Sequence, residues 1–506
     1  MVDSKVTGGC WTCRERKIRC DKQIPFCQNC SRSKRQCKGY GLRLSWPRQG
    51  DQRRAICAQD PRSPEKSSKT LSDNHVRFLN VFTSDLNLYN KICGNNALSV
   101  ISFGNSRIYP QYPRVQKGPS WLPSTLEEHR TTLLSYYEVV ISKMVASVSS
   151  PQFRSLILRM SFADSSPSSC AVLQAIFALA SVHLYGPSPA IAFKQKALLA
   201  LEASLNEETG MREVLQRIAA AMLLGLYEIF DQPDSPYGWA QHICKAKMAV
   251  KGAYTLDTAY QGDLALILDW VYYHDVLSKF SVRHYKQRTI DQVTCAKDKY
   301  IMYKQLASPR KTMILGTFGC SLETLVTISQ IFDVTIELDS CSTVSANTID
   351  KLERRLKFAR QELDIETLDD PEYLVQEQSL RDIAELYRLA GLLYLYRAAK
   401  KAPISHSSVT KFVSDAFEVI GRLQTCERVF PLFIVACEAR TDAQRAEILR
   451  ILANTWKTFR VGNVFRIQQL IERLWAQDDL DSENQLDYSL KITSVLSTGG
   501  ALPAFT

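Results

Sequence analysis

Six cysteines within 28 residues constrain the N-terminal part of this chain more than any other feature of the sequence. The segment CWTCRERKIRCDKQIPFCQNCSRSKRQC covers residues 10–37. Its cysteines are Cys10, Cys13, Cys20, Cys27, Cys30 and Cys37, and the last three repeat the spacing of the first three after a displacement of 17 positions. We therefore interpret the segment as an internal duplicate, in which each half holds a CxxC turn, a short helix and a closing cysteine.

The number of thiols predicts a cluster of two metal ions. A structural zinc ion takes four ligands in a tetrahedron, and each half of the duplicate supplies three thiolates. Two zinc ions have eight coordination positions, which six thiolates fill only when two of them bridge. The equivalent first cysteines of the two halves, Cys10 and Cys27, are the natural bridges. Iron–sulfur ligation and a redox CxxC pair fit this spacing less well.

Basic residues gather around the same segment. The chain has a formal net charge of +11, and residues 1–54 hold 14 of its 63 Lys and Arg against 4 of its 52 Asp and Glu. The rest of the chain is therefore nearly neutral. Two zinc ions and six thiolates sum to a charge of about −2, and nearby Arg and Lys would neutralise this charge and lower the pKa values of the thiols. This role accounts for only part of the excess of basic residues in the segment. A short basic segment is typical of a contact with nucleic acid.

Neither a secretory signal nor a membrane span is expected. The N-terminal sequence MVDSKVTGGCW has no apolar core, and the apolar runs at 171–182 and 218–230 are too short to cross a bilayer. We therefore expect an intracellular protein without a membrane partner. Thiols are kept reduced inside cells, so the other nine cysteines are predicted to be small buried residues. They are Cys57, Cys93, Cys170, Cys244, Cys295, Cys320, Cys341, Cys426 and Cys437.

Helical signals dominate from about residue 120 to the end. Capping patterns begin at Ser124 (STLE, before an apolar face over 133–141), at Ser188 with Pro189, and at Thr441 with Gln444. Only short stretches such as 313–319 are ambiguous between strand and helix. We predict an all-α domain of about a dozen or more helices, either a single irregular bundle or two packed lobes.

The segment between these parts is expected to be a linker. Residues 48–74 are polar and rich in Ser, Pro and charge. Residues 75–90 predict one amphipathic helix with Phe78, Phe82, Leu86 and Tyr89 on its apolar face, too short for a coiled coil. Two oligomeric states stay open, a monomer and a homodimer formed through the large domain.

No catalytic motif is found in the helical region. GxGxxG, GxxxxGK[ST], GxSxG and kinase signatures are absent from the sequence. The pairs Asp369–Asp370 and Asp478–Asp479 are interpreted as helix-end or surface charges. The acidic segment 478–490 has two interpretations, an activation segment or, as we favour, the closing part of the helical domain.

The cysteine segment resembles the fungal binuclear zinc-cluster DNA-binding domain. The resemblance rests on the six-cysteine spacing, on RERKIRCD after the second cysteine, and on Pro25 between the halves. The following KGYGLRLSWP, residues 38–47, is similar to regulators of the arginine and lysine pathways within that family. The helical region resembles the second type of fungal transcription-factor regulatory domain in five stretches, 133–145, 153–184, 237–252, 430–449 and 466–475.

This resemblance implies how the segment would bind double-stranded DNA. The first short helix would enter the major groove and read a CGG triplet with Arg16 and Lys17, since such side chains can donate to guanine O6 and N7. The remaining basic side chains would hold phosphates, with Arg14, Arg19 and Lys22 on the turn of the readers. The phosphate contacts are Arg14, Arg19, Lys22, Lys34, Arg35 and Lys38. Glu15 is expected to pair with a neighbour.

We therefore expect a small metal-stabilised two-helix DNA-binding module over 9–39, a linker with a basic tail and one short amphipathic helix over 40–119, and a large all-α regulatory domain over 120–500. The resemblance implies a nuclear, sequence-specific transcription factor that acts on the RNA polymerase II transcription machinery. An activating role and control by a small-molecule effector are expected from the family. Two alternatives stay open, a zinc-stabilised interaction or repressor module and an enzyme domain with a DNA-targeting head.

Overall fold

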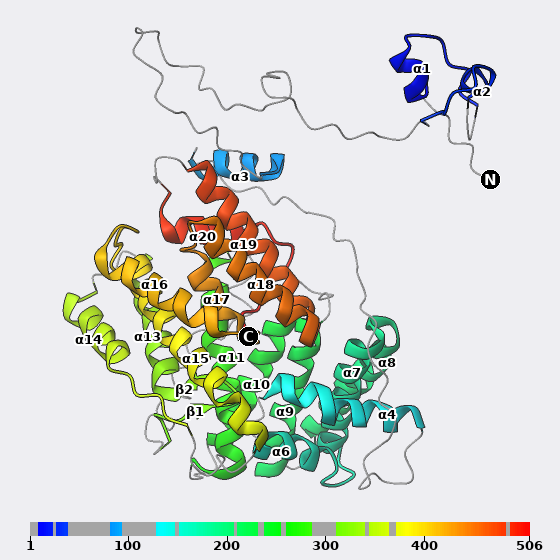
Figure 1. Cartoon of the computed structure of the whole chain (residues 1–506). Helices are drawn as coiled ribbons and strands as arrows, with labels where there is room; N and C mark the ends of the chain where they lie inside the picture. The colour runs from blue at the N-terminus through cyan, green and yellow to red at the C-terminus, as the bar shows by residue number, and fades with distance from the viewer. Residues whose placement is uncertain are drawn as a thin grey trace. The chain divides into compact units, whose positions relative to one another are not determined.

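The chain divides into two units, which we describe separately. One unit is Met1–Val76, called the cysteine unit below, and the other is Arg77–Thr506, called the helical unit. The computed structural model is drawn in Figure 1. It describes residues 9–23, 27–38, 81–93, 128–146, 151–206, 210–230, 237–254, 260–285, 310–339, 344–363, 371–481 and 486–506.

The cysteine unit contains the two short helices that the sequence predicts. They are α1 (Trp11–Glu15) and α2 (Gln28–Arg32), each of five residues. Helices of this length are unstable alone in water. The buried apolar cluster between them consists of cysteines alone, with Cys20 packed against it at the edge. This unit is therefore organised around sulfur.

The described part of the helical unit is almost entirely helical, which confirms the predicted fold class (Figure 1). Its elements are α3 (Thr83–Cys93), α4 (Glu128–Tyr136), the π-helix η1 (Tyr137–Ile141), α5 (Ser142–Val145), α6 (Pro151–Ser161), α7 (Pro167–Tyr185), α8 (Pro187–Ala203), the 3-10 helix η2 (Ser204–Asn206), α9 (Met211–Phe230), α10 (Gly238–Tyr254), α11 (Gly262–His284), β1 (Ile314–Leu315), β2 (Cys320–Ser321), α13 (Leu322–Asp339), α14 (Ala346–Lys357), α15 (Pro371–Tyr394), the π-helix η5 (Leu395–Ala399), α16 (Ser407–Arg422), α17 (Val429–Ala436), α18 (Asp442–Phe459), α19 (Gly462–Leu480) and α20 (Tyr488–Ser497).

The core of the helical unit is one continuous cluster of apolar side chains, so the single bundle is confirmed against two lobes. All eight residues of α17 are buried, as are the consecutive residues Val214–Ile229 of α9. Helices that are buried all round are typical of a protein interior. The aromatic rings of Trp270, Tyr273 and Phe280 on α11 are also buried in this cluster.

Helix α7 is longer than the apolar run at 171–182, which we judged too short to cross a membrane. It is 19 residues long and apolar enough to cross a membrane by length and composition, because the helix extends beyond the apolar run at 171–182. However, 78% of its most apolar window is buried inside the fold. Helices α8 and α9 pack against it. Core packing therefore explains its apolar sequence.

The predicted helix caps have mixed outcomes. Thr441 and Gln444 form the complete capping box of α18, as predicted. Helix α8 instead begins two residues earlier than expected, with Pro187 in its first turn and Gly186 (φ 85°) at the cap position, so Ser188 is not the cap. Ser124 lies outside the described residues.

The ambiguous stretch 313–319 belongs to a small antiparallel hairpin. Strands β1 and β2 pair Ile314 with Ser321 and Leu315 with Cys320. Gly319 in the turn has φ 80°, and a Cβ atom there would lie 3.0 Å from Ile383 and 3.1 Å from Arg428. Glycine is therefore required both by the backbone conformation and by the close packing.

Helix α3 forms near the predicted place but buries a different face. It packs on α19 and α20, as Figure 1 also shows. Its buried residues are Asp85, Leu88 and Ile92, whereas Phe82 is 78% exposed. Phe82 precedes the helix, which begins at Thr83, whereas Leu86 within it is 39% exposed and Tyr89 is half-buried. Phe78 lies outside the described residues.

The scattered cysteines are only partly the buried residues that we predicted. Cys320, Cys426 and Cys437 are buried, and Cys244 is half-buried. Cys93 and Cys170 are exposed, because they lie on the outer faces of the last turn of α3 and the first turn of α7. Cys57, Cys295 and Cys341 lie outside the described residues.

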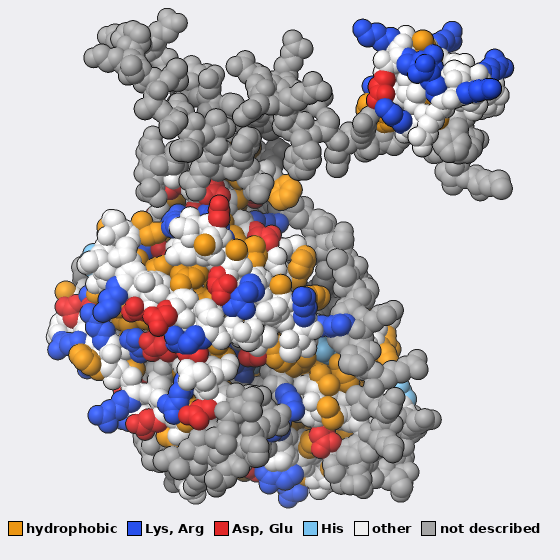
Figure 2. Space-filling model, viewed as in Figure 1, with side chains coloured by type: hydrophobic (Ala, Val, Ile, Leu, Met, Phe, Trp, Pro, Cys, Tyr) orange, Lys and Arg blue, Asp and Glu red, His pale blue; other side chains and the backbone are white. Residues whose placement is uncertain are grey.

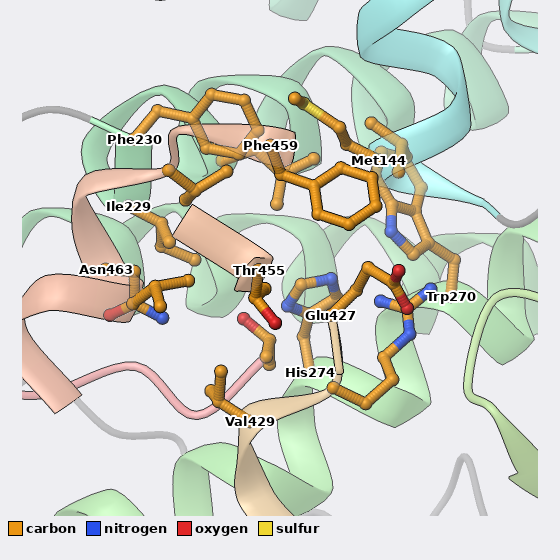
Figure 3. A pocket seen from close by; sticks show the side chains of 16 residues that line it. Met144, Ile229, Phe230, Trp270, His274, Glu427, Val429, Thr455, Phe459 and Asn463 are labelled. Atoms are coloured by element: carbon orange, nitrogen blue, oxygen red, sulfur yellow. The ribbon is translucent and has the colours of Figure 1, made fainter. Parts of the chain in front are cut away.

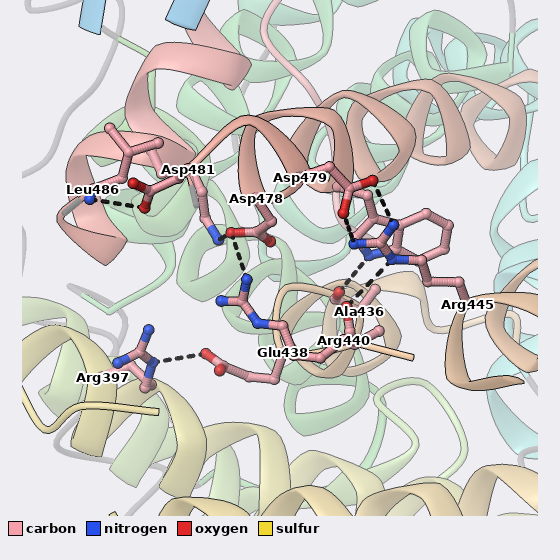
Figure 4. Close-up of polar contacts among 12 residues, drawn as sticks. Arg397, Ala436, Glu438, Arg440, Arg445, Asp478, Asp479, Asp481 and Leu486 are labelled. Atoms are coloured by element: carbon pink, nitrogen blue, oxygen red, sulfur yellow. Dashed lines mark hydrogen bonds and ion pairs between the residues drawn. The ribbon is translucent and has the colours of Figure 1, made fainter. Parts of the chain in front are cut away.

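The acidic segment 478–490 closes the helical unit through ion pairs, as the favoured interpretation expected (Figure 4). Asp479 forms two 2.8 Å hydrogen bonds with Arg445, and Asp487 caps α20. Asp478 and Asp479 lie at the end of α19, as expected, but Asp478 is not a surface charge, because its side chain is 5% exposed and pairs with Lys491. Asp369 and Asp370 lie outside the described residues.

Candidate metal centre and nucleic-acid interface

The two halves of the cysteine unit begin with the same capped turn. Cys10 and Cys27 are the N-cap residues of α1 and α2. The Sγ atom of Cys10 accepts a hydrogen bond from the backbone of Cys13 at 3.4 Å, and that of Cys27 accepts one from Cys30 at 3.3 Å. The first cysteine of each CxxC turn thus acts as the capping residue, a role that Ser or Asp usually fills.

The two helices also end in the same way. Lys17 and Lys34, which are 17 positions apart, both have left-handed backbones, with φ of 55° and 49°. The following amide of Ile18 bonds to the carbonyl of Cys13 at 3.1 Å, and that of Arg35 bonds to Cys30 at 3.0 Å. These turns direct the chain toward the closing cysteine of each half. The structure therefore confirms the internal duplicate.

Two equivalent residues hold the halves together. The hydroxyl of Thr12 donates to the carbonyl of Gln36 at 3.1 Å, and the amide of Asn29 donates to the carbonyl of Arg19 at 2.7 Å. Thr12 and Asn29 are 17 positions apart, and each bonds to the residue that precedes the closing cysteine of the other half. Sequence reasoning missed both residues, although the displacement of 17 could have identified them as a pair.

Asp21 adds a further link between the halves. Its carboxylate accepts hydrogen bonds from the backbone amides of Gln28 at 2.9 Å and Asn29 at 3.3 Å, at the start of α2. The bond from Gln28 is the main cause that lowers the pKa of Asp21, partly opposed by desolvation. Asp21 therefore acts as an additional cap for α2.

The six thiols form two overlapping groups of four. Cys10, Cys27, Cys30 and Cys37 form one group, and Cys10, Cys13, Cys20 and Cys27 form the other, with all Sγ atoms of a group within 4.8 Å of one another. The Sγ atom of Cys10 lies 3.5 Å from that of Cys27 and 3.7 Å from that of Cys30. A tetrahedron with Zn–S bonds of 2.3 Å has edges of about 3.8 Å. Each group therefore fits one tetrahedral zinc ion, and the two groups share Cys10 and Cys27.

Burial acts against ionisation of these thiols. It raises the pKa of Cys10 to about 12 and also raises the pKa values of Cys13 and Cys27. Desolvation is the largest cause of the shift in all three pKa values. Thiolates in this core need cations in direct contact, which zinc ions supply.

We expect Asn29→Ala to weaken zinc binding by about tenfold, because the hydrogen bond from Asn29 to the carbonyl of Arg19 positions the segment that carries Cys20. A competition titration with a zinc-binding dye measures the affinity. Gln36→Ala is the matched control, since only the backbone carbonyl of Gln36 takes part in the equivalent bond. Equal affinities of Asn29→Ala and the unchanged protein would contradict this role.

All eight basic residues singled out from the sequence are exposed, and in Figure 2 most of the charged side chains on the visible face of the cysteine unit are basic. Arg14 stacks on the Trp11 ring at 4.8 Å. Arg16 caps the end of α1 and donates to Ser33 Oγ at 3.3 Å. Lys17 follows directly in the left-handed turn.

Three of the predicted phosphate contacts differ from the expectation. Arg19 and Lys22 are not on the turn of the readers, because α1 ends at Glu15 and the chain reverses at Lys17. Lys38 forms an ion pair with Glu15 at 2.7 Å, which confirms that Glu15 pairs with a neighbour. One of the residues expected to contact phosphate is therefore engaged by a carboxylate. Lys34 and Arg35 follow α2 in the place equivalent to Lys17 and Ile18.

Comparison with known proteins agrees with this geometry. Residues 8–47 match the fungal Zn(2)-Cys(6) binuclear cluster domain, and residues 132–495 match the fungal specific transcription factor domain. No solved structure matches the chain.

Several curated proteins are similar to the chain. Transcription factor iacI of Pestalotiopsis fici is 28% identical over 402 residues, which are 76% of this chain and 97% of that protein. Arginine metabolism regulation protein II of Saccharomyces cerevisiae is 48% identical over 46 residues, 9% of this chain and 5% of that protein. White-opaque regulator 2 of Candida albicans is 48% identical over 40 residues, 8% and 9% of the two chains.

These matches confirm the resemblance seen in the sequence. The binuclear cluster domain binds two zinc ions and DNA, and the matched family and the names of the relatives indicate a transcriptional regulator, not an enzyme. The chain belongs to the family of fungal transcription factors that carry the fungal specific transcription factor domain, with a Zn(2)-Cys(6) cluster domain before it.

Proposed function

We propose that Cys10, Cys13, Cys20, Cys27, Cys30 and Cys37 hold the two zinc ions, with Cys10 and Cys27 as bridges. The observation that carries the proposal is the pair of four-thiol groups that share these two cysteines. The module spans residues 9–39, followed by a linker over 40–119 and the regulatory domain over 120–500.

The same module reads DNA through the end of α1. Arg16 and Lys17 contact the bases of a CGG-type triplet, and Arg14, Arg19, Lys22, Lys34, Arg35 and Lys38 contact phosphates. The exposure of Arg16 and Lys17 and their position at the helix end support this assignment. A donor that projects from a helix end can reach guanine O6 and N7 in the major groove.

We expect Lys17→Ala to reduce discrimination between a CGG site and a scrambled duplex by about 1–3 kcal/mol, since a base contact is lost. Lys34→Ala is the matched control, because Lys34 is the duplicate equivalent and has the same left-handed backbone. It should weaken both duplexes alike and reduce the salt dependence by about one phosphate contact. Fluorescence anisotropy at several salt concentrations measures both effects.

Equal losses on both duplexes for Lys17→Ala would contradict its role as a reader. The design separates this role from backbone strain, since alanine is equally unfavourable in both left-handed turns.

The regulator acts in the nucleus on the RNA polymerase II transcription machinery, as an activator whose helical unit responds to a small-molecule effector. It binds as a monomer or as a homodimer formed through the helical unit. Selection of bound DNA from a random pool with the full chain tests the oligomeric state, because one triplet indicates a monomer and two triplets at fixed spacing indicate a dimer. A fall in the expression of a reporter gene when the protein is produced would contradict an activating role.

A further inference from the structure

A residue expected to read DNA in the first half of the duplicate contacts its own counterpart in the second half. Arg16 and Ser33 are 17 positions apart, which is the displacement of the internal duplicate, and they are the C-cap residues of α1 and α2. The Nη1 atom of Arg16 donates a hydrogen bond to Ser33 Oγ at 3.3 Å. This pair therefore joins the ends of the two helices.

The hydroxyl of Ser33 is available to Arg16 as an acceptor. Its proton is directed at its own helix, because Ser33 Oγ donates to the carbonyl of Asn29 at 2.7 Å and lies 3.2 Å from that of Cys30. A hydroxyl has one proton, so its lone pairs remain for another donor. A guanidinium can only donate, and hydrogen bonds from charged donors are the stronger ones. Ser33 thus offers a fixed acceptor to Arg16.

Asn29 connects this acceptor to the metal-binding frame. Its backbone carbonyl accepts the bond from Ser33, and its side-chain amide donates to the carbonyl of Arg19 at 2.7 Å. Arg19 directly precedes Cys20, which belongs to one of the two four-thiol groups. The position of the Ser33 hydroxyl is therefore set by the folded cluster.

The bond to Ser33 leaves Arg16 able to contact a base. A guanidinium has five N–H donors, and this bond uses one of them. The edge formed by Nε and Nη2 stays free to donate to two acceptors, which is what guanine O6 and N7 require. Within the described residues 9–23 and 27–38, no carboxylate pairs with this guanidinium. Arg16 is therefore restrained by Ser33 without being neutralised.

The other expected reader differs in this respect. Lys17 follows Arg16 in the left-handed turn, and its ammonium has no hydrogen-bond partner among the residues that the structure describes. Ordering a long side chain on binding costs conformational entropy, and a side chain that is already held loses less. Ser33 should therefore favour base contact by Arg16 and leave the contribution of Lys17 unchanged.

We propose that Ser33 is a positioning residue that orients Arg16 for base contact and so adds to the specificity for a CGG-type triplet. An exposed hydrogen bond contributes little in water, but bound DNA excludes water from it, and the restraint then lowers the cost of ordering Arg16. The inference rests on the proposed function, because it requires that Arg16 contacts a base.

Fluorescence anisotropy with the full-length zinc-loaded protein tests this role through the ratio of the affinities for a CGG duplex and a scrambled duplex. Ser33→Ala should lower this ratio about three- to tenfold, whereas Ser33→Thr keeps the hydroxyl and should retain the ratio. Ser31→Ala is the matched control, since Ser31 is another exposed serine of α2 and its hydroxyl has no partner among the described residues. This control should leave the ratio unchanged.

A double-mutant cycle separates positioning from a role in folding. Ser33→Ala should have no further effect on the ratio when Arg16 is already alanine, and it should keep its full effect when Lys17 is alanine. Zinc content and thermal unfolding are measured on the same samples. A residue that acts only on folding would lower the ratio in both backgrounds, and that result would overturn the inference. An unchanged ratio for Ser33→Ala, or an equal loss for Ser33→Thr, would also overturn it.

Failure of the proposed function gives a different result. An unchanged ratio for Arg16→Ala would mean that Arg16 does not read a base, and the positioning role would be lost with it. A lowered ratio for Arg16→Ala, with Ser33→Ala acting equally in its presence and absence, would keep the reader and remove the positioning role alone.

Discussion

Cys27→Ser should remove both zinc ions and lower DNA affinity by at least about 100-fold, because Cys27 belongs to both four-thiol groups. Structural zinc supplies about 10–16 kcal/mol of apparent folding free energy in small zinc domains. Among the described residues 9–23 and 27–38, the apolar core consists of cysteines alone, and no other apolar cluster there could preserve the fold without metal. Elemental analysis of zinc per chain and DNA binding by anisotropy measure the two losses.

A change in a cysteine of one group separates a bridged cluster from two independent sites. Cys37→Ser leaves the group of Cys10, Cys13, Cys20 and Cys27 complete, so it should retain more zinc than Cys27→Ser. Cys170→Ser is the control, since this exposed cysteine lies in the helical unit, and it should keep both zinc ions. Equal zinc content of Cys27→Ser and Cys37→Ser would contradict the bridging role.

The sequence predicted the organisation of this module well, because metal coordination imposes strict spacing. The duplicate of 17 positions anticipated two CxxC turns, each followed by a short helix and a closing cysteine. It did not reveal the bonds of Thr12, Asn29 and Asp21, which cross between the halves and depend on their mutual orientation. The helix end at Glu15 was also hidden, since the left-handed turn at Lys17 has no glycine to mark it.

The helical unit was predictable in class but less so in detail. Capping chemistry is local, so the box at Thr441 could be identified from four residues. Burial depends on distant segments, and here the sequence misled us. Helix α3 buries Asp85 rather than Phe82, and the carbonyl of Asp85 accepts a hydrogen bond from the side chain of Gln477, 392 residues later in the chain. The cavity lined by Met144, His274 and Thr455 likewise joins α5, α11 and α18, which no motif connects (Figure 3).

Buried ion pairs join the last helices of the helical unit (Figure 4). The acidic composition of residues 478–490 did not reveal them in the sequence. Lys491 on α20 lies 2.5 Å from Asp478 on α19, with side chains that are 2% and 5% exposed. Arg440 contacts the same carboxylate oxygen at 3.0 Å. Nearby, Glu438 is fully buried and pairs with Arg397 at 2.9 Å. Desolvation is the main cause that raises the pKa of Glu438, opposed chiefly by Arg397.

Lys491→Met should therefore destabilise the helical unit by about 3 kcal/mol, because it leaves Asp478 buried with Arg440 as its remaining cation. Urea unfolding followed by circular dichroism measures the change, and Lys401→Met is the matched control. Lys401 forms an exposed ion pair with Asp487 at 3.2 Å, so its loss should cost no more than about 1 kcal/mol. The double variant Asp478→Leu with Lys491→Met should recover much of the lost stability, since both members of the buried pair are then replaced by apolar side chains. Equal stabilities of Lys491→Met and Lys401→Met would mean that water reaches Asp478 and that the acidic segment is not held by this pair.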